Sequence, residues 1–194
     1  MIRIAQIQVM VFDGTPVNRT LRQWVEKCPN HAFASHLTKK RYPDLMSLWR
    51  NQMCEWFLRA TTLDYILLLD ADMIPCVEML PILTRPADVM GCNYTQPDGI
   101  DTHDGMPGCG CLRLSRYALE SMETPWFDFV LAPSGVAVEH CECSHLRMRA
   151  KNAGFHPVFE GRMMHIVDAY VKPDGEGGYE TELLANHGLD GKLK

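Results

Sequence analysis

The feature of this sequence that most limits its fold is the stretch from Tyr65 to Pro75, where apolar residues run directly into two aspartates. Residues 65–69 are apolar, Asp70 and Asp72 follow with one alanine between them, and a proline closes the segment. The apolar run falls well below the ~20 residues that a membrane span needs. It is typical of a strand buried on both faces under helices. We therefore expect an α/β fold organised around this strand.

The two aspartates after this strand need a partner, because burying an unpaired charge is costly. In open α/β sheets, ligands bind beyond the carboxyl ends of the strands. Residues i and i+2 of an extended chain point to the same side, so Asp70 and Asp72 can converge on one ligand. A hard divalent cation that carries phosphates is the natural candidate. The alternative is a polar turn in which Asp72 caps the next helix.

Length and composition favour a single globular domain. The chain has 194 residues, 46% of them apolar and 22% charged, which suits one domain with a full core. The net charge of -5 argues against a surface that wraps a nucleic-acid duplex. The first nine residues alternate apolar and polar, as a strand does and a signal peptide does not. We expect no membrane span and a cytoplasmic, reducing location. The eight cysteines are therefore expected to be free thiols or metal ligands rather than disulfides.

Hydrophobic spacing and turn residues predict alternating strands and helices along the chain. Strands are expected at 2–10, 32–37, 65–69, 87–94, 108–114, 155–159 and 161–167. Helices are expected at 17–26, 43 to about 59, 75–83, 115–122 and 144–153, with Ser115 as an N-terminal cap and Gly154 as a stop. This order predicts an α/β fold with a mixed, mostly parallel sheet that gains antiparallel members in its second half. Residues from 172 onward are rich in glycine and charge and are expected to form a tail.

Four segments, in this order, resemble those of one enzyme family. They are Arg50-Asn51; Asp70-Ala71-Asp72; Gly108-Cys109-Gly110-Cys111-Leu112-Arg113-Leu114-Ser115-Arg116 followed by Pro125-Trp126-Phe127; and Glu142-Cys143-Ser144-His145-Leu146, which continues through Arg149 and Ala153-Gly154-Phe155 to His165-Ile166. Together they resemble a small GT-A glycosyltransferase, a nucleotide-diphospho-sugar transferase of the family-2 type. The resemblance implies a GT-A-like catalytic domain over residues 1–168 and a flexible or lid-like tail over 169–194. One departure is that Cys143 and His145 stand where the family carries further acids.

The resemblance implies a metal-bound sugar nucleotide as the donor. Asp70, Asp72 and His165 would bind Mn²⁺ or Mg²⁺, with Asp70 also able to contact the ribose. A divalent cation that bridges both phosphates stabilises the charge of the leaving diphosphate. Both ions accept carboxylates, and Mn²⁺ tolerates an imidazole. Arg50 and Asn51 would lie near the nucleotide of a UDP- or GDP-sugar. The alternative for Arg50 is a solvent-exposed arginine on a helix. The alternative for His165 is an imidazole that is hydrogen-bonded at the end of a strand and binds no metal.

On the acceptor side, Glu142 is the predicted catalytic residue. It could act as the general base that takes the proton of the acceptor hydroxyl. The alternative is that Glu142 only favours the helix N-terminus electrostatically. Trp126 could stack on a sugar or belong to the core. A glycan, a protein, a small molecule or a modified nucleic acid would each serve as acceptor.

Three other functions compete with this prediction. A degenerate GT-A domain would bind a sugar nucleotide or a partner without turnover. A zinc site could use Cys109, Cys111, Cys141 and Cys143 with His140 and His145, although C-x-C is not the usual ligand spacing. Nucleotidyl transfer is disfavoured because the turn at residues 12–16 lacks the glycine-rich basic loop that this chemistry uses.

Overall fold

A computed structural model describes most of the secondary structure of the chain. The described residues are 6–12, 19–28, 31–37, 43–71, 73–75, 77, 80–94, 108–131, 133, 138–165, 169–173 and 179–183. Asp72 lies outside them, and His165 is described by its backbone alone.

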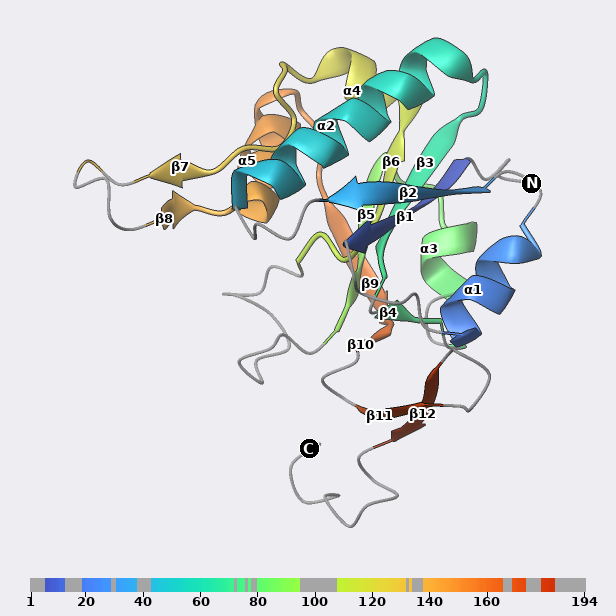
Figure 1. Cartoon of the computed structure of the whole chain (residues 1–194). Coiled ribbons are helices and arrows are strands. Elements are labelled where there is room, and N and C mark those ends of the chain that lie inside the picture. The colour runs from blue at the N-terminus through green and yellow to red at the C-terminus, as the bar shows by residue number, and fades with distance from the viewer. Residues whose placement is uncertain are drawn as a thin grey trace.

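The elements follow one another in a mixed order of strands and helices (Figure 1). They are β1 (Gln6–Phe12), α1 (Arg19–Glu26), β2 (His31–Leu37), α2 (Pro43–Ala60), β3 (Tyr65–Asp70), β4 (Met73–Ile74), α3 (Leu80–Thr84), β5 (Val89–Asn93), β6 (Cys111–Ser115), α4 (Arg116–Ser121), β7 (Val130–Leu131), β8 (Val138–His140), α5 (Glu142–Asn152), β9 (Val158–Arg162), β10 (Met164–His165), β11 (Ala169–Pro173) and β12 (Tyr179–Leu183).

The strand 65–70 lies inside a six-stranded sheet and is buried on both faces, as predicted. The sheet order is β2-β1-β3-β6-β5-β9. Ile66 and Leu68 of β3 pack in one cluster with residues of α2, α4 and α5. Leu67 and Leu69 pack on the opposite face with residues of α1 and α3. Helices therefore cover both faces of the sheet (Figure 1), which explains the continuous apolar run.

The expectation of a mostly parallel arrangement is not borne out. β1 pairs with β2 and β3 in parallel, and β5 pairs with β9 in parallel. β6, however, runs antiparallel to both of its neighbours, β3 and β5. The ribbons β4–β10, β7–β8 and β11–β12 are antiparallel as well. Among the described pairings, antiparallel pairs thus outnumber parallel ones, and the fold is mixed α/β.

Several element boundaries also differ from the sequence prediction. The sequence predicts a helix from Pro75; the structure has the strand Met73–Ile74, which pairs with β10, before that residue, and the described helix α3 covers Leu80–Thr84. α5 begins at Glu142, two residues earlier than expected. The described residues of the predicted tail form the antiparallel ribbon β11–β12. The cap at Ser115 is confirmed, since its side chain accepts a hydrogen bond from the Ala118 N–H at 2.9 Å.

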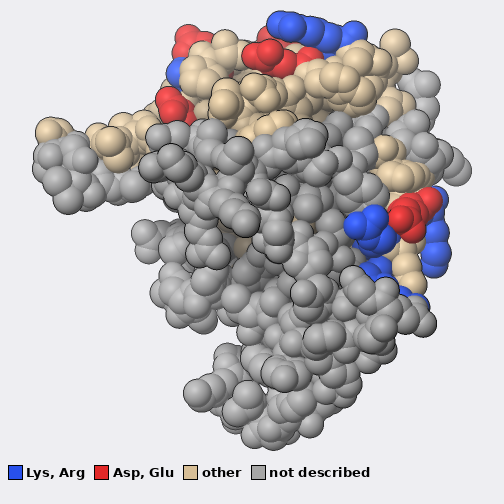
Figure 2. Space-filling view, viewed as in Figure 1, with Lys and Arg blue, Asp and Glu red and all other residues tan. Residues whose placement is uncertain are grey.

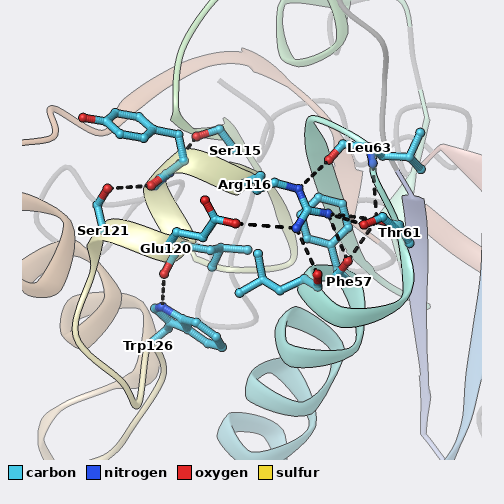
Figure 3. Close-up of polar contacts among 12 residues, drawn as sticks. Phe57, Thr61, Leu63, Ser115, Arg116, Glu120, Ser121 and Trp126 are labelled. Atoms are coloured by element: carbon cyan, nitrogen blue, oxygen red, sulfur yellow. Dashed lines mark hydrogen bonds and ion pairs between the residues drawn. The ribbon is translucent and has the colours of Figure 1, made fainter.

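Arg116, at the start of α4, ties this helix to the carboxyl end of α2 (Figure 3). Its guanidinium donates to the carbonyls of Phe57, Leu58, Thr61 and Leu63 over distances of 2.7 to 3.2 Å. Phe57 and Leu58 lie in the last turn of α2, where carbonyls have few partners within the helix. The carbonyls of Thr61 and Leu63 belong to the segment that follows it. Arg116 thereby fixes α2, the helix that carries Arg50 and Asn51.

Charged side chains on the face seen in Figure 2 gather near α2 and α4 and, separately, near α1. In the ion pairs Arg22–Glu26 and Arg59–Glu55, at least half of each side chain is exposed. Such pairs contribute little to stability. Among the described helices, none combines the length and apolarity needed to cross a bilayer.

Candidate functional site

The candidate site starts at Asp70, the last residue of β3. Its backbone N–H donates to the carbonyl of Gly110, just before β6, at 2.9 Å. Its carboxylate accepts two hydrogen bonds from Nη2 of Arg50, at 2.9 and 3.1 Å. The Arg50 side chain is 1% exposed, which rules out the solvated helix arginine that the sequence left open. Asp70 and Arg50 therefore form a buried ion pair at the carboxyl end of the central strand.

Arg50 has a second carboxylate partner, Glu142, the first residue of α5. Nη1 of Arg50 forms an ion pair with Oε1 of Glu142, whose side chain is 6% exposed. Burial lowers the pKa of the Arg50 guanidinium, but the Asp70 carboxylate raises it, and the pKa ends above its ordinary value. Arg50 is therefore a charged bridge that joins β3 to α5. Sequence analysis selected all three residues but did not predict this bridge.

The antiparallel ribbon β4–β10 brings a late strand of the chain, β10, beside the aspartate motif. Its register pairs Met73 with His165 and Ile74 with Met164. The backbone of His165 therefore lies next to the residue that follows Asp72. The side chains of Asp72 and His165 are outside the described part of the chain, so metal binding by Asp70, Asp72 and His165 stays a prediction.

Gly110 and Tyr94 pack closely against each other next to Asp70. The N–H of Gly110 donates to the Tyr94 hydroxyl at 2.7 Å. A Cβ at position 110 would lie 2.9 Å from that hydroxyl oxygen and 3.2 Å from the sulfur of Met73. Burial and, after it, the Asp70 carboxylate raise the pKa of Tyr94, so its hydroxyl stays neutral. Sequence analysis treated Tyr94 only as the end of a strand, because nothing in the local pattern reveals this contact.

Asn51 is engaged with the backbone of residues 126 and 127. Its Oδ1 accepts from the N–H groups of Trp126 and Phe127, at 3.0 and 3.1 Å, and its Nδ2 donates to the Phe127 carbonyl at 2.7 Å. Trp126 is buried, and its indole N–H donates to the carbonyl of Leu119 at 3.0 Å. Trp126 thus belongs to the core. Asn51 has a structural task here, and its contact with a nucleotide stays a prediction.

The cysteines that sequence analysis combined into one zinc set fall into two groups. Cys109 and Cys143 are neighbours, since the Cys109 N–H donates to the Cys143 sulfur at 3.1 Å. A hydrogen bond between the two side chains is the main cause that raises the pKa of the Cys143 thiol, to about 12. A bond to Cys143 likewise raises the pKa of Cys141 to about 12. Cys111 lies in the other core cluster beside Cys92, and burial raises its pKa most, followed by a bond to Cys92.

The two histidines of the predicted zinc set do not join these thiols in the described contacts. Nε2 of His145 lies 3.3 Å from the Pro125 carbonyl and accepts from Nε of Arg149 at 3.2 Å. His140 is exposed at the end of β8. The six-residue zinc set is therefore not assembled. A smaller group does come together: the ligand atoms of Cys109, Glu142 and Cys143 all lie within 4.8 Å of one another.

Taken together, the fold and the site define a mixed α/β domain with a buried carboxylate–arginine–carboxylate bridge at the end of its central strand. No protein-family model matches the sequence, and no curated protein matches it. Among solved structures, the chain is similar to A197 from STIV, with a TM-score of 0.59 and 13% identity over 92% of this chain and 94% of that one. At this identity the likeness shows a shared fold alone.

A second solved structure is a glycosyltransferase involved in the glycosylation of the major capsid of PBCV-1. It aligns with a TM-score of 0.47 and 12% identity, over 83% of this chain and 92% of that one.

Proposed function

We propose that this chain is a metal-dependent glycosyltransferase that moves a sugar from a nucleotide diphosphate to a hydroxyl acceptor. The observation that carries the proposal is the convergence of the four resembling segments. Arg50 of the first binds Asp70 of the second, the Asp70 backbone bonds to Gly110 of the third, and Arg50 also pairs with Glu142 of the fourth. The Asp70–Gly110 bond continues the β3–β6 pairing, whereas an α/β fold by itself does not require the two contacts of Arg50.

The cation belongs to Asp70, Asp72 and His165 in this proposal. Two carboxylates with one imidazole suit Mn²⁺, and carboxylates alone suit Mg²⁺. Two features support the fit. The Asp70 side chain at the strand end is still 17% exposed, and the β4–β10 register sets His165 opposite Met73. When bound, the ion neutralises charge on the departing diphosphate. Arg50 does not bind the cation in this proposal; it orients the Asp70 carboxylate through their ion pair.

Glu142 is better suited to positioning than to proton transfer. A general base must come within about 2.6–3.2 Å of the hydroxyl that it deprotonates, yet Glu142 is almost completely buried. Accepting a proton would also cost Glu142 its attraction to Arg50. We propose that Glu142 acts through Arg50, which in turn holds Asp70. If Glu142 were the base after all, Glu142→Gln would lower kcat and remove the acidic limb of the kcat/KM pH profile. A positioning residue leaves the shape of that profile unchanged.

A panel of UDP-, GDP- and TDP-sugars tests the function by melting temperature, with and without Mn²⁺. A ligand at 100 times its Kd stabilises the folded state by about 2.7 kcal/mol, which for a domain of this size raises Tm by about 5–11 °C. We expect one donor to do so only with metal present, and Asp72→Ala to remove the shift. If no sugar nucleotide changes Tm in the presence of Mn²⁺, the transferase proposal is wrong.

A domain that binds a sugar nucleotide without turnover is the second candidate. The burial of Glu142 and its ion pair with Arg50 favour it, because Cys143 and His145 stand where the resembling family carries further acids. Slow hydrolysis of the bound sugar nucleotide in Mn²⁺, lost in Asp72→Ala, would exclude this candidate. Donor binding without any hydrolysis or transfer would support it.

A further inference from the structure

A compact group of cysteine thiols lies next to the Arg50 bridge and meets it at Glu142, and neither the cation site nor the proposed reaction uses the thiols. We call Cys109, Cys141, Cys143 and Glu142 the thiol cluster. Sγ of Cys109, Sγ of Cys143 and a carboxylate oxygen of Glu142 lie within 4.8 Å of one another. Around a tetrahedral zinc ion, ligand atoms lie about 3.3–3.8 Å apart, as Zn–S and Zn–O distances of about 2.3 and 2.0–2.2 Å require. A small inward movement therefore suffices to bind the ion.

The second observation is a buried acceptor in the same cluster. Oε1 of Glu142 faces Arg50, while Oε2 is buried and has no hydrogen-bond partner among the described residues. Buried carboxylate oxygens are normally paired, and leaving one without a partner costs about 1–3 kcal/mol or more. A cation held between Oε2 and the two sulfurs would remove this cost.

We propose that Cys109, Cys143 and Oε2 of Glu142 bind a zinc ion, with Cys141 as the fourth ligand. Cys141 is the cap residue of α5, one position before Glu142, and its sulfur lies 3.3 Å from the Ser144 hydroxyl. Each thiol that binds loses its proton to solvent as the Zn–S bond forms. The thiolate charges offset both the zinc ion and the nearby Arg50 guanidinium.

This zinc site differs from the Mn²⁺ or Mg²⁺ site in ligand chemistry and in role. Thiolates select zinc, whereas carboxylates and phosphates select the harder ions. A zinc ion with four protein ligands is structural. Here it would fix the start of α5, whose cap residue Cys141 makes no side-chain capping bond, against the segment before β6. It would also hold Glu142 toward Arg50. The proposal does not depend on the transferase function.

The test uses the full chain, purified under reducing conditions without added metal. We expect about one equivalent of zinc by elemental analysis. After chelation, titration with Co²⁺ should give the intense near-ultraviolet thiolate-to-cobalt band and the visible bands of a tetrahedral ion. The double variant Cys109→Ser/Cys143→Ser should lose both, and Glu142→Gln should weaken zinc binding.

Cys28→Ser is the matched control, because Cys28 is a half-buried thiol whose sulfur donates to the Trp24 carbonyl outside the cluster. It should bind zinc as the unmodified chain does. The cobalt spectrum is recorded on the unmodified chain, so this test does not depend on whether any variant folds. Absence of zinc together with absence of a thiolate–cobalt band would overturn the proposal, as would unchanged affinity in the folded double variant. Neither measurement involves a sugar nucleotide, so this failure is separate from failure of the transferase proposal.

Discussion

Replacing Arg50 by methionine tests whether the buried bridge holds the site together. The substitution keeps an unbranched apolar stem but removes the guanidinium, which leaves the carboxylates of Asp70 and Glu142 without their cation. Removing one partner of a buried ion pair costs about 3–5 kcal/mol, because the remaining charge is buried unpaired. Arg50 is 1% exposed and both partners are mostly buried, so the full range applies. For a domain of this size the loss lowers Tm by about 6–20 °C.

Urea unfolding at neutral pH measures the free energy of unfolding directly, and Arg59→Met provides the matched control. Arg59 lies on the same helix, but its side chain is 80% exposed and its nitrogen lies 3.6 Å from Glu55. Removing such a surface pair changes stability by ~0.5 kcal/mol or less. If Arg50→Met costs no more than Arg59→Met, the bridge does not stabilise the fold.

The double variant Arg50→Met/Glu142→Gln separates the bridge from general packing. Glu142→Gln removes one of the two charges that Arg50 neutralises, so the double variant should be more stable than the sum of the single losses predicts. Coupled residues of this kind show interaction energies of about 0.5–3 kcal/mol. Strictly additive losses would mean that Arg50 and Glu142 do not interact, contrary to the structure.

Three further substitutions test the supports of the site, each by urea unfolding. Gly110→Ala should cost about 1–3 kcal/mol, since the new Cβ would meet the Tyr94 hydroxyl at 2.9 Å; an unchanged free energy of unfolding would show that Tyr94 yields freely. Arg116→Met should cost about 2 kcal/mol or more, because two carbonyls in the last turn of α2 and two just after it lose the Arg116 donor. Arg59→Met on α2 should change little by comparison. Asn51→Ala should cost about 1–3 kcal/mol by leaving the backbone N–H groups of Trp126 and Phe127 unpaired, whereas a loss below 0.5 kcal/mol would show that water replaces the amide.

The cysteine pairs show why the sequence could not tell which thiols lie together. Cys109 and Cys111 are two residues apart, yet Cys109 meets Cys143 and Cys111 packs with Cys92. Cys109 precedes β6 and Cys111 begins it, so the turn into the strand separates their surroundings. Which thiols gather depends on the neighbouring strand and helix, and these are distant in the sequence.

The sequence by itself determined the features that arise from local patterns. The apolar run 65–69 predicted a strand buried on both faces, the apolar spacing after Pro43 predicted α2, and Ser115 predicted the start of α4. Local periodicity and capping chemistry are enough for these, because they act over a few residues.

Only the tertiary structure decided the direction of β6 and the partners of Arg50. A strand buried on both faces has the same residue pattern whether its neighbours run parallel or antiparallel to it, so the buried segment 111–115 could not reveal that it opposes β3 and β5. An arginine on a helix likewise carries no local sign of burial. Arg50 is buried because the packing of α2 brings it to two carboxylates from β3 and α5, and burial of its charge is tolerated only with such partners.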